Sequence, residues 1–413
     1  MTLHIFNPDH DLALASGLEN FTAPHAGRQL RHDLGWLPAL WADADDYILV
    51  DDVAAAERGA RRRPVRCRRF VSCQQLSSLP ISRIEPWGWN VALCAYLRRH
   101  GIENNDYALH ATSHQLKTKE ELDTIRQLSH RRTAALLLPL LQGEGTVGEA
   151  IECTTQEEAL SQIARYGQAV LKAPWSSSGR GVRFVSSGED RSYKSYETYE
   201  SYETHKSYET YKSYEPHKSH ETYKSHKSHE SHPSYPLDKN IEGWLRNTLL
   251  RQGSVMVEPQ YTKVKDFGME FFSDGAGHVS YLGLSLFHTS NGAYTGNVIA
   301  TEQAKREALS HYLPTLLLDQ AQERICQLLG NTFKDKYCGP FGIDMMVVKS
   351  DHLSPLTAHH FLHPCVEINL RRTMGHVALA LGSIYNPSDD DEVRHVMRIN
   401  YSNNNYKLQI KRQ

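Results

Sequence analysis

The sequence has few features of a secreted, zinc-binding or membrane protein. Its seven cysteines are scattered, and no two of them are spaced as CxxC. This argues against a disulfide framework or zinc site and indicates a reduced compartment. No apolar run reaches the roughly 18 residues that span a membrane, and the opening MTLHIFNPDHDLALAS lacks the basic segment of a signal peptide. We expect a cytoplasmic protein with no membrane partner.

The chain also lacks an excess of charge of either sign. Its 413 residues carry a formal net charge of −2, which gives no electrostatic reason to expect a nucleic acid partner. The basic run RGARRRPVRCRRF, residues 58–70, is the exception. We interpret it as a solvated loop and strand edge, with contact to an anionic substrate or polynucleotide as the alternative.

The length and the hydrophobic content of 40% favour two or three domains. Short strands such as LHIFNP and DYILVDD alternate with helices, one of them expected at about residues 90–100. We predict a small α/β domain over residues 1–112. Two further subdomains are predicted over residues 113–255 and 256–400.

Residues 188–238 are dominated by hexads such as SYKSYE, TYESYE and TYKSHK. Their period of three matches neither a helix nor a strand, and the hexads contain no aliphatic side chain whose burial could offset the entropy of ordering. We predict a disordered low-complexity insertion in a surface loop. A His/Tyr metal-binding segment or a phosphorylation platform is the alternative.

The segment VLKAPWSSSGRGVRFV, residues 170–185, is a candidate phosphate loop. Lys172 ends an apolar strand, and the Ser/Gly turn that follows can bring backbone N–H groups close to an anion. The segment is not GxxxxGK[ST] and does not open a helix. On these residues alone, a plain hairpin stays the alternative.

A second candidate is the strand VEINLRR, in which Glu367, Asn369 and Arg371 project from one face. Glu and Asn offer the hard oxygen ligands that suit Mg²⁺, and Arg suits phosphate charge. Asp344, in FGIDMMVV, would lie near Glu367 if the two strands pair, and two such carboxylates repel unless a cation is present. A solvated strand face and a buried structural Asp are the alternatives.

Further polar positions are weaker candidates. Glu258 ends the strand in SVMVEPQY and Asp266 follows eight residues later, where they could serve an adenine edge and ribose hydroxyls. We interpret the HHFLH histidines, residues 359–363, as an exposed loop rather than a metal cluster. Substrate contacts are also open for polar residues after the first strand and in GLSLFHTSNGAYTGNVIA, namely Asn7, Asp9, His10, His288, Thr289, Asn291, Tyr294 and Asn297.

Taken in order, VLKAPWSSSGRGV, VMVEPQY with its downstream KD, FGIDMMV and VEINLRRTMGH resemble the motifs of the ATP-grasp superfamily of ATP-dependent ligases, over about residues 115–385 without the repeat. The resemblance implies an α/β (α+β) fold, in which a two-subdomain ATP-grasp unit follows a small α/β pre-grasp domain. It also implies ATP as cofactor, with Lys172 on the phosphates and a loop closing over them. That loop comprises Ser176, Ser177, Ser178, Gly179, Arg180 and Gly181.

The resemblance assigns the remaining roles residue by residue. Adenine would be held by Glu258 and the Tyr261 backbone, and ribose by Asp266. Mg²⁺ would be held as two ions, with Mn²⁺ as the alternative metal, and the ligands would be Asp344, Glu367 and Asn369. Catalysis would rest on Arg371, which stabilises the phosphoryl group, together with Lys172.

This sequence departs from the superfamily pattern at a lysine that the members carry N-terminal to the ATP-grasp unit. The corresponding region here is LSHRRTAALL, so Arg131 or Arg132 is the expected replacement, with Lys119 a weaker candidate. Arg in place of Lys changes the geometry of a phosphate contact.

The function implied is a ligase that activates a carboxylate as an acyl phosphate for attack by an amine or similar nucleophile, releasing ADP and phosphate. Its partners would be small-molecule or peptide carboxylates and amines, and a homodimer is left open. Two alternatives stand beside it. One is a non-catalytic nucleotide-binding or scaffold protein, and the other is an ATP-grasp kinase that phosphorylates a hydroxyl.

Overall fold

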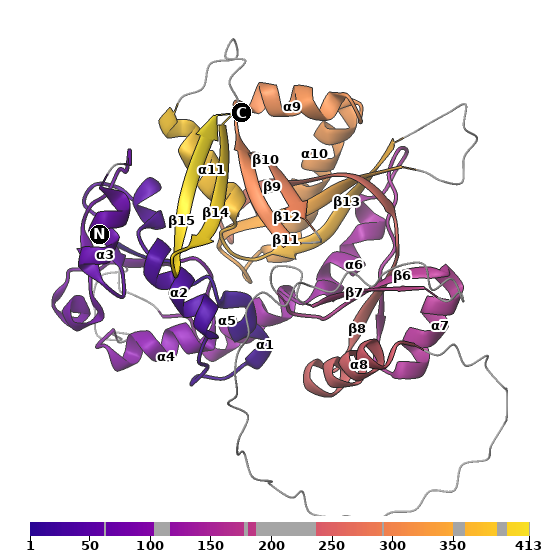
Figure 1. The fold of residues 1–413 in the computed structure, drawn as a ribbon, viewed down its shortest axis with the longest axis horizontal. Coiled ribbons are helices and arrows are strands. Elements are labelled where there is room, and N and C mark those ends of the chain that lie inside the picture. Colours follow the sequence, from indigo (N-terminus) through magenta and orange to yellow (C-terminus); the bar gives the residue numbers. More distant parts are fainter. Residues whose placement is uncertain are drawn as a thin grey trace, which may run out of the picture.

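The computed structural model describes residues 1–61, 63–102, 116–176, 181–186, 237–290, 293–349, 360–385 and 395–412. The hexad repeat, predicted as a disordered insertion, lies outside the described residues. Three β-sheets with flanking helices form the described part (Figure 1). The predicted α/β fold class is therefore confirmed. No helix in these ranges is both long and apolar enough to cross a lipid bilayer.

The first sheet is a parallel, four-stranded sheet in the order β3-β2-β1-β4. Its helix α4 begins where Asn90 Oδ1 accepts the backbone N–H of Leu93 at 2.9 Å, which is the usual N-cap contact. The helix expected at about residues 90–100 is thus present. The elements are β1 (Thr2–Ile5), α1 (His10–Ser16), α2 (His25–Leu34), η1 (Leu37–Leu40), β2 (Tyr47–Leu49), α3 (Val53–Ala60), β3 (Phe70–Val71), η2 (Cys73–Ser78), β4 (Arg83–Pro86) and α4 (Val91–Arg99).

The second sheet is small and antiparallel, in the order β5-β8-β6-β7. Helix α7 begins with a capping box between Thr155 and Glu158 and is followed by Gly167, whose φ is 73°. The elements are β5 (Ile151–Cys153), α7 (Gln156–Tyr166), β6 (Gln168–Lys172), β7 (Val182–Ser186), α8 (Lys239–Gln252) and β8 (Val255–Pro259).

The third sheet has seven strands in the order β13-β12-β9-β10-β11-β14-β15. Its strands are β9 (Thr262–Ser273), β10 (Val279–Ser290), β11 (Ala293–Ile299), β12 (Gly339–Lys349), β13 (His360–Asn369), β14 (His395–Ser402) and β15 (Asn405–Arg412). The helices that accompany it are α5 (Lys119–Leu128), α6 (Arg131–Leu141), α9 (Glu302–Ser310), α10 (Thr315–Phe333) and α11 (Met374–Tyr385).

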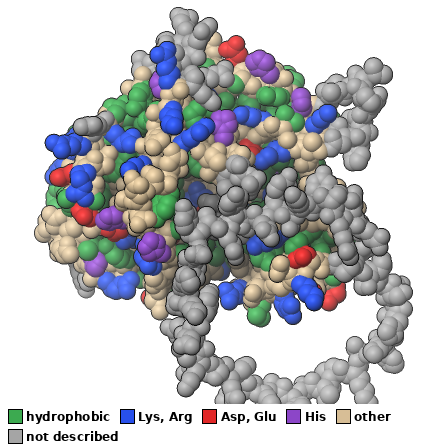
Figure 2. All heavy atoms as spheres, viewed as in Figure 1, with side chains coloured by type: hydrophobic (Ala, Val, Ile, Leu, Met, Phe, Trp, Pro, Cys, Tyr) green, Lys and Arg blue, Asp and Glu red, His purple; other side chains and the backbone are tan. Residues whose placement is uncertain are grey.

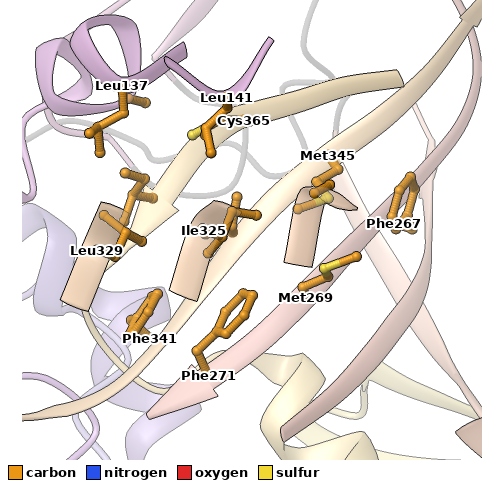
Figure 3. Close-up of a cluster of buried hydrophobic side chains, with 14 of the residues drawn as sticks. Leu137, Leu141, Phe267, Met269, Phe271, Ile325, Leu329, Phe341, Met345 and Cys365 are labelled. Carbon is orange, nitrogen blue, oxygen red and sulfur yellow. The ribbon is translucent and has the colours of Figure 1, made fainter. Parts of the chain in front are cut away.

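The core of this large sheet lies on the face covered by α6 and α10 (Figure 3). Phe267, Met269 and Phe271 alternate along β9 and pack there, together with Ile325 and Leu329 of α10. Because side chains alternate along a strand, the residues between them project from the opposite face. That opposite face of β9, β12 and β13 is where the polar side chains are found.

The basic run at residues 58–70 packs over aromatic rings of the first domain. The Arg63 guanidinium lies 4.9 Å from the Trp36 ring centre, and that of Arg69 lies 4.2 Å from the Tyr47 ring. Figure 2 shows Lys and Arg side chains spread over the visible face of the molecule. The interpretation of the run as a loop and strand edge is wrong for residues 58–60, which form the last turn of α3, and the run then continues as a loop to β3 at Phe70.

Helix α10 provides a matched test of this core, since it carries one buried and one exposed leucine. Leu329 is 2% exposed and Leu316 is 65% exposed. We expect Leu329→Ala to lower the free energy of unfolding by about 2–5 kcal/mol, and Leu316→Ala to change it by less than about 0.5 kcal/mol. Urea unfolding followed by circular dichroism measures both. Similar losses in the two variants would contradict the described packing.

Candidate functional site

Asp344 and Glu367 lie directly opposite each other on the paired strands β12 and β13. Burial, with the negative charges of Glu367 and Glu270 beside it, raises the pKa of Asp344 to about 7. Asn369 lies on the same face of β13 and its side-chain nitrogen donates to Asp344 Oδ2 at 3.2 Å. Two carboxylates and an amide therefore meet at one place on the polar face of the sheet.

Two arginines from distant parts of the chain partly offset this negative charge. Arg371 donates to both carboxylate oxygens of Asp11, in α1, at 2.8 Å each, and also to Asn369 Oδ1 at 2.8 Å. Arg131, at the start of α6, forms an ion pair with Glu367 at 2.8 Å. The Arg371 guanidinium, expected to meet a phosphoryl group, is thus held by the first domain.

Arg131 also connects the segment after β6 of the small sheet to β13 of the large sheet. Its Nη1 donates to the Ala173 carbonyl at 2.6 Å and to Ser176 Oγ at 2.7 Å. Arg131, Arg132 and Lys119 are the candidates to replace the lysine that the superfamily carries N-terminal to the ATP-grasp unit, and Arg131 is the one paired with Glu367. Arg132 instead pairs with Glu152 at 2.9 Å.

Lys172 and Glu258 form a buried ion pair with 2.5 Å between the charged atoms. The pair follows from the sheet register, since β6 and β8 are antiparallel neighbours. Lys172 is predicted to contact the phosphates and Glu258 the adenine, whereas here the two side chains bind each other. A nucleotide would have to separate this pair to make both predicted contacts.

The remaining predicted nucleotide contacts lie nearby. Asp266 accepts from Lys263 Nζ and from Thr289 Oγ1, each at 2.6 Å. The Tyr261 ring packs edge-on against the His363 ring, and burial raises the pKa of Tyr261 to about 12. In the predicted phosphate loop, Ser176 and Gly181 are described, whereas Ser177, Ser178, Gly179 and Arg180 lie outside the described residues.

Several weaker candidates have structural partners of their own. Asn7 donates to the Gly88 carbonyl at 2.8 Å, and a ring nitrogen of His10 lies 3.1 Å from the Asn90 amide nitrogen. Asn297 is buried and donates to Ser285 Oγ at 2.8 Å. The expectation of exposed HHFLH histidines is wrong for His363, because this part of the segment is inside β13 and His363 is buried.

Two acidic residues at the site, Asp11 and Glu270, are not among the residues predicted from the sequence. Asp11 follows the first strand, and its partner is 360 positions away, so no local pattern reveals the pair. Glu270 of β9 lies opposite Gly342 of β12, and its negative charge contributes to the raised pKa of Asp344. An acid in an otherwise apolar strand, the signal that identified Asp344, was equally present at Glu270.

Asp344, Glu367 and Asn369 fit a divalent cation in chemistry. They offer hard oxygens, and burial together with the facing Glu367 carboxylate disfavours the charged form of Asp344, which a bound cation would stabilise. Within the described ranges, no group of three or more His, Cys, Asp or Glu side chains is arranged to hold a metal. The candidate site therefore consists of two carboxylates and an amide.

No protein-family model and no curated protein matches the sequence. Solved structures that are similar include N5-carboxyaminoimidazole synthetase from Staphylococcus aureus complexed with ADP, with 10% identity, a TM-score of 0.46, and coverage of 97% of this chain and 82% of that one. A biotin carboxylase–ATP analogue complex from Campylobacter jejuni has 11% identity, a TM-score of 0.46, and coverage of 96% and 75%. Both are ATP-grasp enzymes. Because these TM-scores lie below 0.5, the similarity carries no weight for substrate or reaction.

The raised pKa of Asp344 makes metal binding depend on pH. The side chain is neutral below about pH 7 and charged above it, and a metal ligand must be ionised. We expect the Mg²⁺ affinity to rise roughly tenfold between about pH 6 and about pH 8, measured by calorimetric titration. Asp344→Asn should bind Mg²⁺ weakly at both pH values. An affinity independent of pH in the wild type would contradict this assignment.

The Asp11–Arg371 pair should show strong coupling in stability. Asp11→Asn or Arg371→Gln alone leaves a partly buried charge without its partner, which destabilises by about 1–3 kcal/mol. The double variant should lose clearly less than the sum of the two single losses. Urea unfolding of the four proteins gives the coupling energy, and simple additivity would show that the pair does not hold the first domain to β13.

Proposed function

We propose that the protein is an ATP- and Mg²⁺-dependent ligase that activates a carboxylate as an acyl phosphate, which an amine or similar nucleophile then attacks. The observation that carries the proposal is the meeting of Asp344, Glu367 and Asn369 with Arg131 and Arg371. Oxygen ligands for a cation and guanidinium groups for phosphate charge are the components that phosphoryl transfer requires.

The nucleotide would lie between the small sheet and the large sheet. A triphosphate would compete with Glu258 for Lys172, because the triphosphate and the Glu258 carboxylate are both anions that can pair with the Lys172 ammonium. Release of Glu258 from the pair would leave its carboxylate as an acceptor for the adenine amino group. Asp266, which already accepts from Thr289, has further oxygen lone pairs for ribose hydroxyls.

Asp344, Glu367 and Asn369 would hold Mg²⁺, as one or two ions, and the bound metal would neutralise charge on the transferring phosphate. Arg371 would face the same group, with its orientation fixed by both oxygens of Asp11. Arg131 keeps the segment after β6 next to Glu367 through its bonds to Ala173 and Ser176.

In the first step, a substrate carboxylate oxygen bonds to the γ-phosphorus, and the bond from that phosphorus to the β,γ-bridging oxygen breaks to release ADP. In the second step, the nucleophile bonds to the acyl carbon, and phosphate leaves with the electron pair of the C–O bond. The nucleophile loses its proton to solvent or to the departing phosphate. Exclusion of water protects the acyl phosphate in between.

Arg131 in place of the expected lysine favours one second candidate, a protein that binds nucleotide without turnover. An Arg presents a planar fork to phosphate where a Lys presents a point charge. In addition, the guanidinium is already paired with Glu367. The two candidates share the nucleotide site and differ in whether ADP is released.

ADP release, screened against pools of carboxylates and amines with mass spectrometry of the product, tests the proposal. We expect Glu367→Gln and Asn369→Ala to lower Mg²⁺-dependent ADP release by about 100-fold or more, with unchanged circular dichroism spectra. Glu323→Gln, on the exposed side of α10, is the matched control and should keep full activity.

The product and the nucleotide balance separate the candidates. An amide or similar acyl product supports the ligase, whereas a phosphorylated hydroxyl would assign a kinase instead. ATP that binds and is not hydrolysed with any pool would assign the non-catalytic protein. Unchanged turnover in both site variants would overturn the assignment of Glu367 and Asn369.

A further inference from the structure

His363 is a buried histidine whose ring has no hydrogen-bond partner in the described part of the protein. It is 1% exposed, and neither Nδ1 nor Nε2 is bonded. A buried polar group without a partner costs roughly 1–3 kcal/mol relative to a paired one. Such groups are uncommon in native structures and usually have a functional reason.

The surroundings of the ring place it at the predicted nucleotide site. The Tyr261 ring lies against it edge-on, with 5.7 Å between the ring centres. The Lys172 ammonium is close enough for its charge to act on the imidazole. Because β13 belongs to the large sheet and Lys172 ends β6 of the small sheet, the ring lies where the two sheets approach each other.

The backbone leaves space for this ring. Gly148 has no side chain, and a Cβ built there would lie 2.8 Å from His363 Nε2 and 3.0 Å from Leu138 Cδ2. Its φ of +144° is also unfavourable for other residues. The chain therefore packs closely around an imidazole, although an apolar ring or branched side chain would fill such a space without leaving polar atoms unpaired.

The imidazole is neutral over the whole physiological range. Burial, with the Lys172 charge added, lowers the pKa of His363 to about 3. A neutral imidazole carries one donor and one acceptor nitrogen. It suits a ligand with neutral donors and acceptors, such as a purine base edge, better than a phosphate or a carboxylate.

We propose that His363 is a nucleotide-specificity residue, whose ring hydrogen-bonds the polar edge of the purine base when ATP lies between the two sheets. The proposal deepens the proposed function and rests on it, since it uses the same nucleotide site. The Tyr261 ring lies against the His363 ring, so Tyr261 would have to shift for the base to reach His363.

His363→Leu separates a functional histidine from a structural one, because the two predict opposite outcomes for binding. Removal of an unpaired polar group should raise the midpoint of thermal unfolding. Loss of one hydrogen bond to the base should weaken ATP binding by roughly tenfold. It should also lower the ratio of the ATP affinity to the GTP affinity. Differential scanning fluorimetry and calorimetric titration with a non-hydrolysable ATP analogue and the matching GTP analogue measure both.

Two further variants complete the experiment. His360→Leu, on the same strand, is the matched control, since its ring packs against Tyr312, and it should keep the wild-type nucleotide affinity. His363→Gln retains a donor and an acceptor and should recover part of the lost ATP affinity.

The outcomes distinguish this inference from the function beneath it. ATP analogue binding by His363→Leu that is as tight and as selective as in the wild type would overturn the inference and leave the proposed ligase intact. If the Leu variant does not fold, wild-type binding by His363→Ala would overturn it in the same way. No binding of either nucleotide by the wild type would overturn the proposed function itself.

Discussion

The repulsion between Asp344 and Glu367 is the constraint on which the arrangement of the site depends. Their strands pair in a register that places the two carboxylates opposite each other, in a setting where burial already disfavours charge. The chain counters this with two guanidinium groups: Arg131 comes from 236 positions before Glu367, and Arg371, on the same segment as Glu367, is held by Asp11, 360 positions before it. The complete set of contacts therefore requires α1 and α6 to be in place beside the large sheet.

The parts that could be predicted from the sequence are those set by local chemistry. The alternation in VEINLRR places Glu367, Asn369 and Arg371 on one face, and the capping box at Thr155 fixes the start of α7. The pairing of β12 with β13, which the proximity of Asp344 and Glu367 requires, joins two apolar strands that follow each other in the chain. Each of these features depends on residues close together in the chain.

The parts that could not be predicted depend on partners across the fold. The sequence shows Lys172 and Glu258 as two separate strand ends, and only the sheet order makes them neighbours. The HHFLH pattern indicates an exposed loop, yet the strand continues into it and buries His363. Helices α5 and α6 likewise have amphipathic patterns that do not specify a sheet, and the apolar side chains of α6 pack in the core of the large one.

The hairpin formed by β14 and β15 adds a consequence for biosynthesis. These strands extend the large sheet, but Leu408 and Met397 share an apolar cluster with Trp36 and Phe6 of the first domain. The Asp33 carboxylate accepts the backbone N–H of Tyr406, and Arg63 donates to the Leu408 carbonyl. During translation, the first domain therefore emerges from the ribosome long before the strands that complete its core. Its apolar face stays exposed until the hairpin arrives, and a chaperone would have to cover it in the meantime.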